Sequence, residues 1–314
     1  MQFDYAATAM RPAWSDLPEA VRAGIEGNIA APVNHSAIAA GGFTPGFAAV
    51  LNQHWFVKAA PATVPWLFRA YRREAEVAAV LPTGLPMPEF RGAAQLDDGG
   101  TTWQLLFFAA ESGTVPGNPW TDSALDAIES ALLLVDTELT PAPVGLEPED
   151  LARTWREHPR LDEVFPAPMP DFVPDLSVAG RSELQTLLCG APTALAGESL
   201  LHNDLRPDNI LLTERGALFC DWNYLARGPR WADWVVMLAY ARFDGLDVAD
   251  RLVGSALSRD ADPEHIDSWL ALLLAYMLQA GGQAEIADSP ALRGHQKFSA
   301  GMLLDWLIER RDLS

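Results

Sequence analysis

The sequence has few cysteines, few basic residues and no long apolar run. Cys189 and Cys220 are its only cysteines, so no disulfide framework is implied. Its 22 Lys and Arg against 42 Asp and Glu leave a formal net charge of -20. No basic stripe is visible, which argues against nucleic acid as a partner, because a phosphate backbone needs clustered Lys and Arg. The surplus of acids either attracts a cationic small molecule or simply keeps the surface solvated.

Nothing in the sequence predicts a membrane segment or a secretion signal. The longest apolar run, residues 269–278, is too short to span a bilayer. The first residues lack the basic segment followed by an apolar one that marks an exported protein. We therefore expect a cytoplasmic protein without a membrane anchor, and its 314 residues are enough for two lobes or domains.

Residues 201–212, LHNDLRPDNILL, are the one place where charged and amide side chains crowd together inside an apolar run. Asp204 is followed at the second position by Arg206 and at the fifth by Asn209. Kinases space a catalytic base, a cation near the phosphate and a metal-binding amide in this way. Phosphoryl transfer needs these groups within a few ångströms of one another, and one short loop can supply all three. The spacing predicts the catalytic loop of an ATP-dependent phosphotransferase.

A second acidic position follows in residues 217–223. The strand-like run ALFC ends directly in Asp221, where kinases place a metal-holding aspartate at the end of a strand. Asn209 and Asp221 are therefore the predicted Mg²⁺ ligands. An isolated match to either cluster would be weak, but two clusters in the right order are much more specific.

These two segments, with Gly228, Pro229 and Asp233 beyond them, resemble the aminoglycoside phosphotransferase family of small-molecule kinases. The triplet His-Gly-Asp of that family stands here as His202, Asn203 and Asp204. Asn203 departs from the family, although Asn tolerates a positive φ better than most residues. The resemblance makes Asp233 the structural acid that braces the catalytic loop.

Lys58 lies in the predicted strand 54–59, HWFVKA. Alternation places Phe56 and Lys58 on one face of this strand, so Phe56 is expected to stand over the nucleotide base while Lys58 reaches the phosphates. A Lys inside an apolar strand is costly to bury without an anionic partner, unless its charged end reaches water at the sheet edge. The preceding Gly-rich turn, with Gly41 and Gly42, would let backbone N–H groups approach phosphates. An ordinary hairpin turn has the same composition.

The partner of Lys58 is expected on the helical run 66–80, which offers Glu74 and Glu76. Residues two apart on a helix face different directions, so only one can pair with the lysine. The family resemblance favours Glu74. It also implies that backbone groups at the end of the strand 101–109 hold the adenine edge, which points to Phe108 and Ala110.

We therefore expect an α+β, two-lobed protein-kinase-like fold. Residues 1–108, with a leading helix at 15–27, form the mostly β nucleotide-binding lobe, and residues 109–314 form the mostly helical lobe. The expected reaction moves the γ-phosphate of ATP, with Mg²⁺, to a hydroxyl of a small molecule. The base is Asp204, and Arg206 lies near the phosphate.

The acceptor is open, because acceptor contacts lie in variable loops. Cationic antibiotics such as aminoglycosides, choline-like amines, sugars and amino alcohols are all compatible, and an antibiotic acceptor would imply resistance. The Pro- and acid-rich stretch 141–174 either borders the acceptor site or is a solvated connector. A nucleotide-binding pseudokinase is the alternative from another class, and the intact Lys58, Asp204, Asn209 and Asp221 argue against it. A protein kinase is weaker still, since Asn203 and Asn223 replace the arginine and glycine of its motifs.

Overall fold

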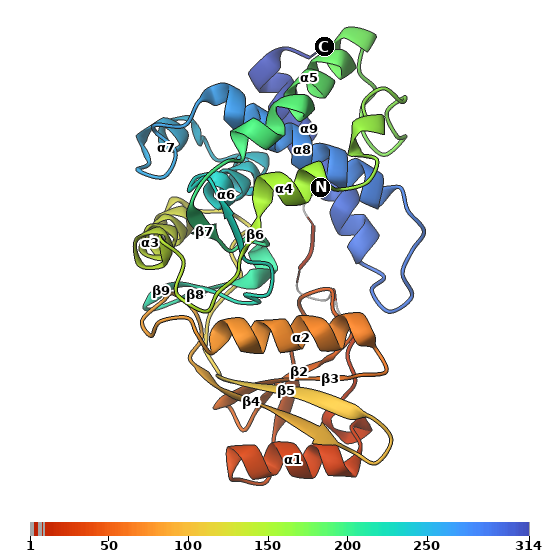
Figure 1. Ribbon diagram of the computed structural model, residues 1–314, viewed down its shortest axis with the longest axis vertical. Coiled ribbons are helices and arrows are strands. Elements are labelled where there is room, and N and C mark those ends of the chain that lie inside the picture. The colour runs from red at the N-terminus through yellow and green to blue at the C-terminus, as the bar shows by residue number, and fades with distance from the viewer. Residues whose placement is uncertain (1–2, 6–7, 9, 314) are drawn as a thin grey trace.

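The structure, a computed structural model, describes residues 3–5, 8 and 10–313. Figure 1 shows two lobes, one built on a sheet and the other on helices. The predicted α+β arrangement, with a mostly β first lobe and a mostly helical second lobe, agrees with the structure. No helix in this described part of the chain is long and apolar enough to cross a membrane.

The sheet lobe holds five antiparallel strands in the order β1-β2-β3-β5-β4. Their bounds are β1 (Ser36–Ile38), β2 (Phe47–Leu51), β3 (Trp55–Pro61), β4 (Phe90–Asp97) and β5 (Thr102–Ala109). A 3-10 turn η1 (Trp14–Asp16) and the helix α1 (Glu19–Ile29) precede them, and α2 (Pro65–Ala78) follows β3. In Figure 1, α1 covers the outer face of the sheet and α2 covers the face toward the helical lobe.

Strand alternation divides the core of this lobe into two layers. Val57 and Ala59 pack with Val21 and Ile25 of α1, because alternate side chains of β3 point to opposite faces. Phe56 packs on the other side, in the apolar cluster under α2. Strand β3, which carries Lys58, is therefore packed on both faces.

The leading helix begins later than predicted. Ser15 belongs to η1, and Pro18 occupies the N-cap position of α1. A helix that begins at residue 15 is wrong because a proline disfavours the helical conformation of the residue before it. Leu17 is accordingly extended, with φ -70° and ψ 143°.

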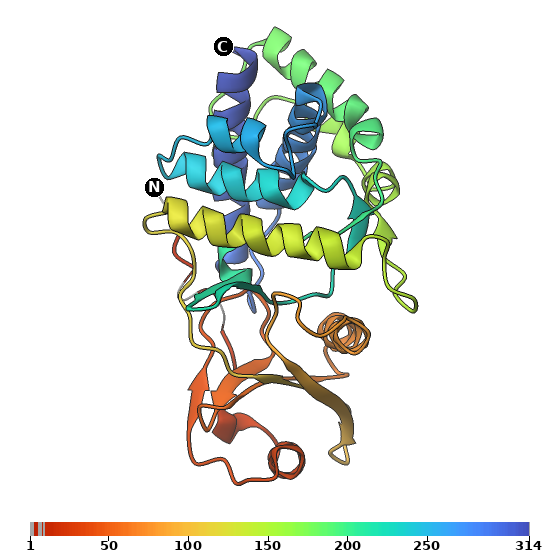
Figure 2. The same ribbon diagram turned by 90° about the vertical axis from the view of Figure 1, so that its left-hand side faces the viewer.

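The helical lobe contains helices and short strands that alternate along the chain. Their bounds are α3 (Asp122–Leu139), β6 (Glu149–Asp150), α4 (Leu151–Arg156), η2 (Leu161–Glu163), α5 (Val178–Ala194), β7 (Ser199–Leu201), η3 (Pro207–Asn209), β8 (Ile210–Thr213), β9 (Gly216–Phe219), β10 (Ala226–Gly228), α6 (Ala232–Phe243), α7 (Ala249–Gly254), α8 (Pro263–Gly281) and α9 (Leu292–Arg311). In the turned view of Figure 2, α3 runs across the end of this lobe nearest the sheet. Leu270 and Leu274 of α8 are fully buried, which makes α8 a central helix of this lobe.

Two short strand pairs hold the segment that the sequence marks as catalytic. β7 pairs with β10, and β8 pairs with β9 as an antiparallel hairpin. Residues 202–209 therefore lie between two anchored strands, and β9 runs directly into the segment of Asp221. Both ends of this loop are fixed by backbone hydrogen bonds, so its side chains keep defined positions.

Candidate active site

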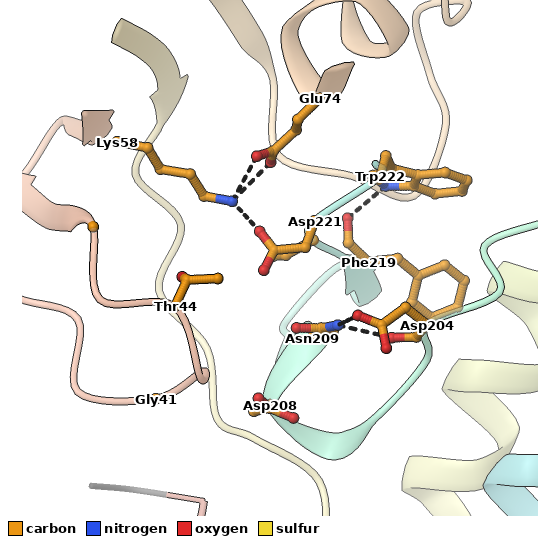
Figure 3. A network of polar contacts seen from close by, with 12 residues as sticks. Gly41, Thr44, Lys58, Glu74, Asp204, Asp208, Asn209, Phe219, Asp221 and Trp222 are labelled. Atoms are coloured by element: carbon orange, nitrogen blue, oxygen red, sulfur yellow. Dashed lines mark hydrogen bonds and ion pairs between the residues drawn. The ribbon is translucent and has the colours of Figure 1, made fainter. Parts of the chain in front are cut away.

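The first cluster of the site joins the sheet lobe to the helical lobe through Lys58 (Figure 3). Its Nζ lies 2.8 Å and 2.9 Å from the two carboxylate oxygens of Glu74 and also contacts Asp221. Lys58 and Glu74 are 5% and 3% exposed, so the pair is shielded from water. Glu76, the alternative partner, instead pairs with Arg72 at 3.3 Å on the surface of α2. The structure thus brings three of the predicted residues into one buried ion-pair cluster.

The charged groups of this cluster shift one another's pKa values. Burial lowers the pKa of Lys58, but Asp221 and Glu74 outweigh it and raise the pKa above its ordinary value. Burial raises the pKa of Glu74, and the neighbouring ammonium opposes the rise. Burial acts upward on Asp221 as well, but Lys58 outweighs it and holds the pKa of Asp221 below its ordinary value. The lysine therefore stays protonated and Asp221 stays ionised.

The second cluster lies within the catalytic loop. Arg206 donates to the Asp204 carboxylate at 2.6 Å and to Asp208 at 3.1 Å. The side-chain amide of Asn209 donates to the Asp204 carbonyl oxygen at 2.7 Å and to its carboxylate at 3.2 Å. Asp204, Arg206 and Asn209 are thus brought together as the spacing implied. Asp208 was missed, although a carboxylate two residues from an arginine in the same loop was an available signal.

His202 and Asp233 hold the backbone of this loop. The Asp233 carboxylate accepts hydrogen bonds from the N–H groups of His202 at 2.8 Å and Asn203 at 3.1 Å. The His202 Nε2–H donates to the Cys220 carbonyl at 2.7 Å, and its Nδ1 accepts from the Asp204 N–H at 3.3 Å. This arrangement requires the neutral imidazole, and burial lowers the pKa of His202 to about 4. A neutral histidine therefore ties the segment of Asp221 to that of Asp204.

Burial also changes the acidity of the two carboxylates of this region. It raises the pKa of Asp204 to about 6, with Arg206 opposing. It raises the pKa of Asp233 to about 7, with the hydrogen bonds from His202 and Asn203 opposing. An Asp204 that titrates near 6 is ionised at neutral pH yet is more basic than an exposed aspartate, as suits a group that accepts a proton.

Asn209 and Asp221 lie on adjacent segments, since the N–H of Cys220 donates to the Asn209 carbonyl at 2.8 Å. Among the described residues no three His, Cys, Asp or Glu side chains gather into a metal cluster. One amide and one carboxylate nevertheless fit Mg²⁺, which keeps several waters and takes further oxygens from substrate phosphates.

A small apolar hollow adjoins the Lys58 pair. Phe56 and Phe108, which face each other across β3 and β5, both line it. The prediction that Phe56 and Lys58 share a face therefore agrees with the structure, and the Lys58 Nζ lies 6.0 Å from the centre of the Phe56 ring. The other lining residues are Glu74, Ala78, Met87, Pro88, Phe219, Cys220, Asp221 and Trp222.

The backbone N–H groups of Ala109 and Ala110, at the end of β5, already form hydrogen bonds. The Ala110 N–H donates to the His54 carbonyl at 3.1 Å, and the Ala109 N–H donates to the Glu89 carbonyl at 2.8 Å. Ala110 can thus offer an adenine ring its carbonyl oxygen but not its N–H. Phe108 pairs with Phe56 within the sheet, and its side chain, 5% exposed, lines the hollow.

The Gly-rich turn lies across from the catalytic loop, with Gly41 and Thr44 opposite Asp208 and Asp221 in Figure 3. Phe43 reaches the helical lobe, since its carbonyl accepts from Ser289 at 2.7 Å. Its ring centre lies 5.1 Å from the Arg206 guanidinium. The turn belongs to the sheet lobe and, through Phe43, also contacts the helical lobe near Asp221. Sequence reasoning missed Ser289, which carries no local signal for this contact.

Comparisons with known proteins agree on the family. The model of the phosphotransferase enzyme family, APH, matches residues 39–269. The structure of the GDP and kanamycin complex of APH(2″)-IIIa is similar with a TM-score of 0.62 and 16% identity, covering 92% of this chain and 97% of that chain. A ternary complex of the aminoglycoside phosphotransferase APH(4)-Ia with AMP-PNP and hygromycin B has a TM-score of 0.61 and 11% identity, with 94% and 100% covered.

At these identities the two structures establish the fold, while the family model establishes the membership. A search of curated protein sequences found no match. The family match spans well over half of the chain and confirms the resemblance inferred from the motifs. The similar structures confirm the predicted kinase-like fold, and the chain belongs to the phosphotransferase enzyme family.

Proposed function

We propose that this protein transfers the γ-phosphate of ATP, with Mg²⁺, to a hydroxyl of a small molecule. The observation that carries the proposal is the joining of the two clusters by the loop backbone. The Lys58, Glu74 and Asp221 cluster is connected through Cys220 and His202 to Asp204. A phosphate-binding cation and a proton-accepting carboxylate are thus held in fixed relation, as phosphoryl transfer requires.

In this proposal each residue has a distinct task. Lys58, oriented by Glu74, binds the phosphates of the nucleotide, while Asn209 and Asp221 would hold Mg²⁺. A bound Mg²⁺ would supply positive charge to the phosphate oxygens. Asp204 orients the acceptor hydroxyl and takes its proton, and its pKa of about 6 supports this role near neutral pH.

In the resting site Arg206 is engaged with carboxylates of its own loop. Its guanidinium is shared between Asp204 and Asp208. An acceptor hydroxyl that donates to Asp204 competes with this ion pair, and the released N–H groups of Arg206 are then free for the transferring phosphate. Arg206 thus exchanges a carboxylate for a phosphate during the reaction.

For the acceptor we propose a hydroxylated, cationic small molecule, with aminoglycosides first among the candidates. The net charge of -20 supports a cation, and similar structures are complexes with kanamycin and hygromycin B. Such an activity would confer resistance. We place the reaction in the cytoplasm, where ATP is abundant and the thiols of Cys189 and Cys220, both unpaired, remain reduced. We also place the boundary of the nucleotide lobe after residue 108.

A screen of ADP or GDP release tests the proposal. The full-length protein is supplied with Mg²⁺, ATP or GTP, and a panel of aminoglycosides, choline-like amines, sugars and amino alcohols. Asp204→Ala serves as the blank. Acceptor-dependent release that is lost in the variant supports the proposal. Nucleotide binding without release above the blank for every member of the panel would favour a pseudokinase.

A further inference from the structure

The side chain of Arg11 contacts the Gly-rich turn, residues 41–46, although Arg11 lies far from this turn in the sequence. Its guanidinium donates to the carbonyl oxygens of Gly41 at 2.9 Å and Gly46 at 3.2 Å, and it lies 3.5 Å from the hydroxyl of Thr44. It therefore bridges the two ends of residues 41–46. Arg11 precedes the region matched by the family model, residues 39–269, so nothing in that match assigns it a role.

The charge of Arg11 is not neutralised where it lies. Among the residues that the structure describes, no carboxylate forms an ion pair with it, although most arginines of this acidic chain have one. Its Nε is buried without a hydrogen-bond partner. A half-buried guanidinium that contacts only neutral oxygens has lost hydration without gaining an anion. The site is therefore suited to receive one.

The turn that Arg11 bridges packs beside Lys58. Gly46, whose carbonyl accepts from Arg11, lies against Tyr71, since a Cβ at Gly46 would lie 2.8 Å from the Tyr71 hydroxyl. The Lys58 Nζ lies 5.5 Å from the centre of the Tyr71 ring. Figure 3 shows the same turn facing the Asp221 carboxylate. Arg11 is thus held at the edge of the cluster of Lys58 and Asp221.

The hydrogen bonds to the turn also orient its amides. The C=O and N–H of a trans peptide point in opposite directions. The bond from Arg11 to the Gly41 carbonyl thus turns the Gly42 N–H away from the guanidinium. Thr8 donates to the Gly42 carbonyl at 2.6 Å and orients the Phe43 N–H likewise. Gly42 has φ +89°, which favours glycine, and a Cβ there would lie 2.8 Å from Arg11 Nη2, so a side chain would displace the guanidinium.

We propose that Arg11 is a positioning residue for the nucleotide phosphates: it braces residues 41–46 as an anion-binding turn and adds a cation behind that turn. The inference rests on the proposed function, since it concerns the same nucleotide. A phosphate that enters this turn gains the charge of Arg11 and meets backbone N–H groups already turned by its hydrogen bonds.

The test compares the affinities of the full-length protein for Mg-ATP and for adenosine. Arg11→Met keeps most of the aliphatic stem but removes the charge and the donors, and Arg11→Lys keeps the charge without the bridging fork. Arg69→Met, at an exposed arginine of α2, is the matched control. Calorimetry should show Mg-ATP binding weakened about tenfold to a hundredfold in Arg11→Met and less in Arg11→Lys. Adenosine affinity and the control should be unchanged.

If the role of Arg11 is purely structural, the measured affinities should differ from these. Equal losses of ATP and adenosine affinity, together with a lower melting temperature, would overturn the proposal, and so would unchanged ATP binding in Arg11→Met. If the wild-type protein binds no nucleoside triphosphate, the proposed function fails together with this inference. Wild-type binding with no difference in the variants removes the inference alone.

Discussion

The carboxylate of Asp233 lies 3.1 Å from the backbone nitrogen of Asn203 and helps to hold that residue at a φ of 63°. Only glycine adopts this conformation without cost, and asparagine is the best tolerated of the other residues. Asn203 adds a hydrogen bond from its side chain to the Tyr224 carbonyl at 3.1 Å. The departure from the glycine of the family is thus accommodated by local contacts.

Asn203→Ala should be less stable than Asn203→Gly by about 1 kcal/mol in the free energy of unfolding. Both substitutions lose the hydrogen bond to Tyr224. The difference between their stabilities therefore measures the cost of the left-handed backbone conformation at residue 203. Urea denaturation of the two variants measures it. Equal stabilities would mean that the loop relaxes to a negative φ when the side chain changes.

Asp204→Ala should lower kcat about 100-fold or more and leave Mg-ATP affinity nearly intact, because positioned proton transfer contributes on that order. Asp250→Ala, at an exposed acid of α7, is the control for loss of a carboxylate. Steady-state kinetics with the acceptor found in the screen provide the measurement. Full turnover in Asp204→Ala would show that the base has been misassigned.

The pH profile of kcat/KM should rise up to about pH 6 and level off above it. Burial raises the pKa of Asp204 to about 6, and only the ionised carboxylate accepts the proton, so activity is lost as pH falls through that value. Initial rates between pH 4.5 and 8 test this. A midpoint near pH 4 would show that the carboxyl is hydrated in the working enzyme.

Asp221→Ala and Asn209→Ala should each weaken Mg²⁺-dependent nucleotide binding, and Asp221→Ala more severely because it loses a full charge. Titration calorimetry with ATP, with and without Mg²⁺, separates the metal-dependent part. Unchanged Mg-ATP binding in Asp221→Ala would count decisively against the metal assignment.

Phe56→Ala should weaken ATP binding about tenfold if the ring stacks on adenine, since base stacking on an aromatic ring contributes about 1 to 3 kcal/mol. The structure also packs Phe56 under α2, so some thermal stability should be lost. Val57→Ala, on the opposite face of β3, is the control that lowers stability alone. A collapsed melting temperature with normal ATP affinity would make Phe56 a core residue only.

Local spacing was enough to predict much of this site. Asp204, Arg206 and Asn209 lie within six residues, so a single loop conformation brings them together whatever the rest of the chain does. Helix geometry permits only one of Glu74 and Glu76 to face β3, and the family resemblance favoured Glu74.

Contacts between distant segments escaped prediction. Arg11 meets Gly41 across 30 residues, and nothing in the sequence near it marks a nucleotide site. The Ala110 N–H pairs with His54 because β5 extends beside the turn before β3, and that register is set by the folded sheet. The start of α1 was misplaced because Pro18 keeps Leu17 out of the helical conformation.

The burial of Lys58 has a practical consequence for chemical labelling. The chain has only two lysines, Lys58 and Lys297. Lys58 is buried and kept protonated by Glu74 and Asp221, whereas Lys297 is half-buried beside Phe172, with its Nζ 5.7 Å from the ring centre. An amine-acylating reagent should therefore modify Lys297 readily and Lys58 only when its ion-pair cluster opens. The two modification rates, read by peptide mass spectrometry, would record how often the space between the lobes opens in solution.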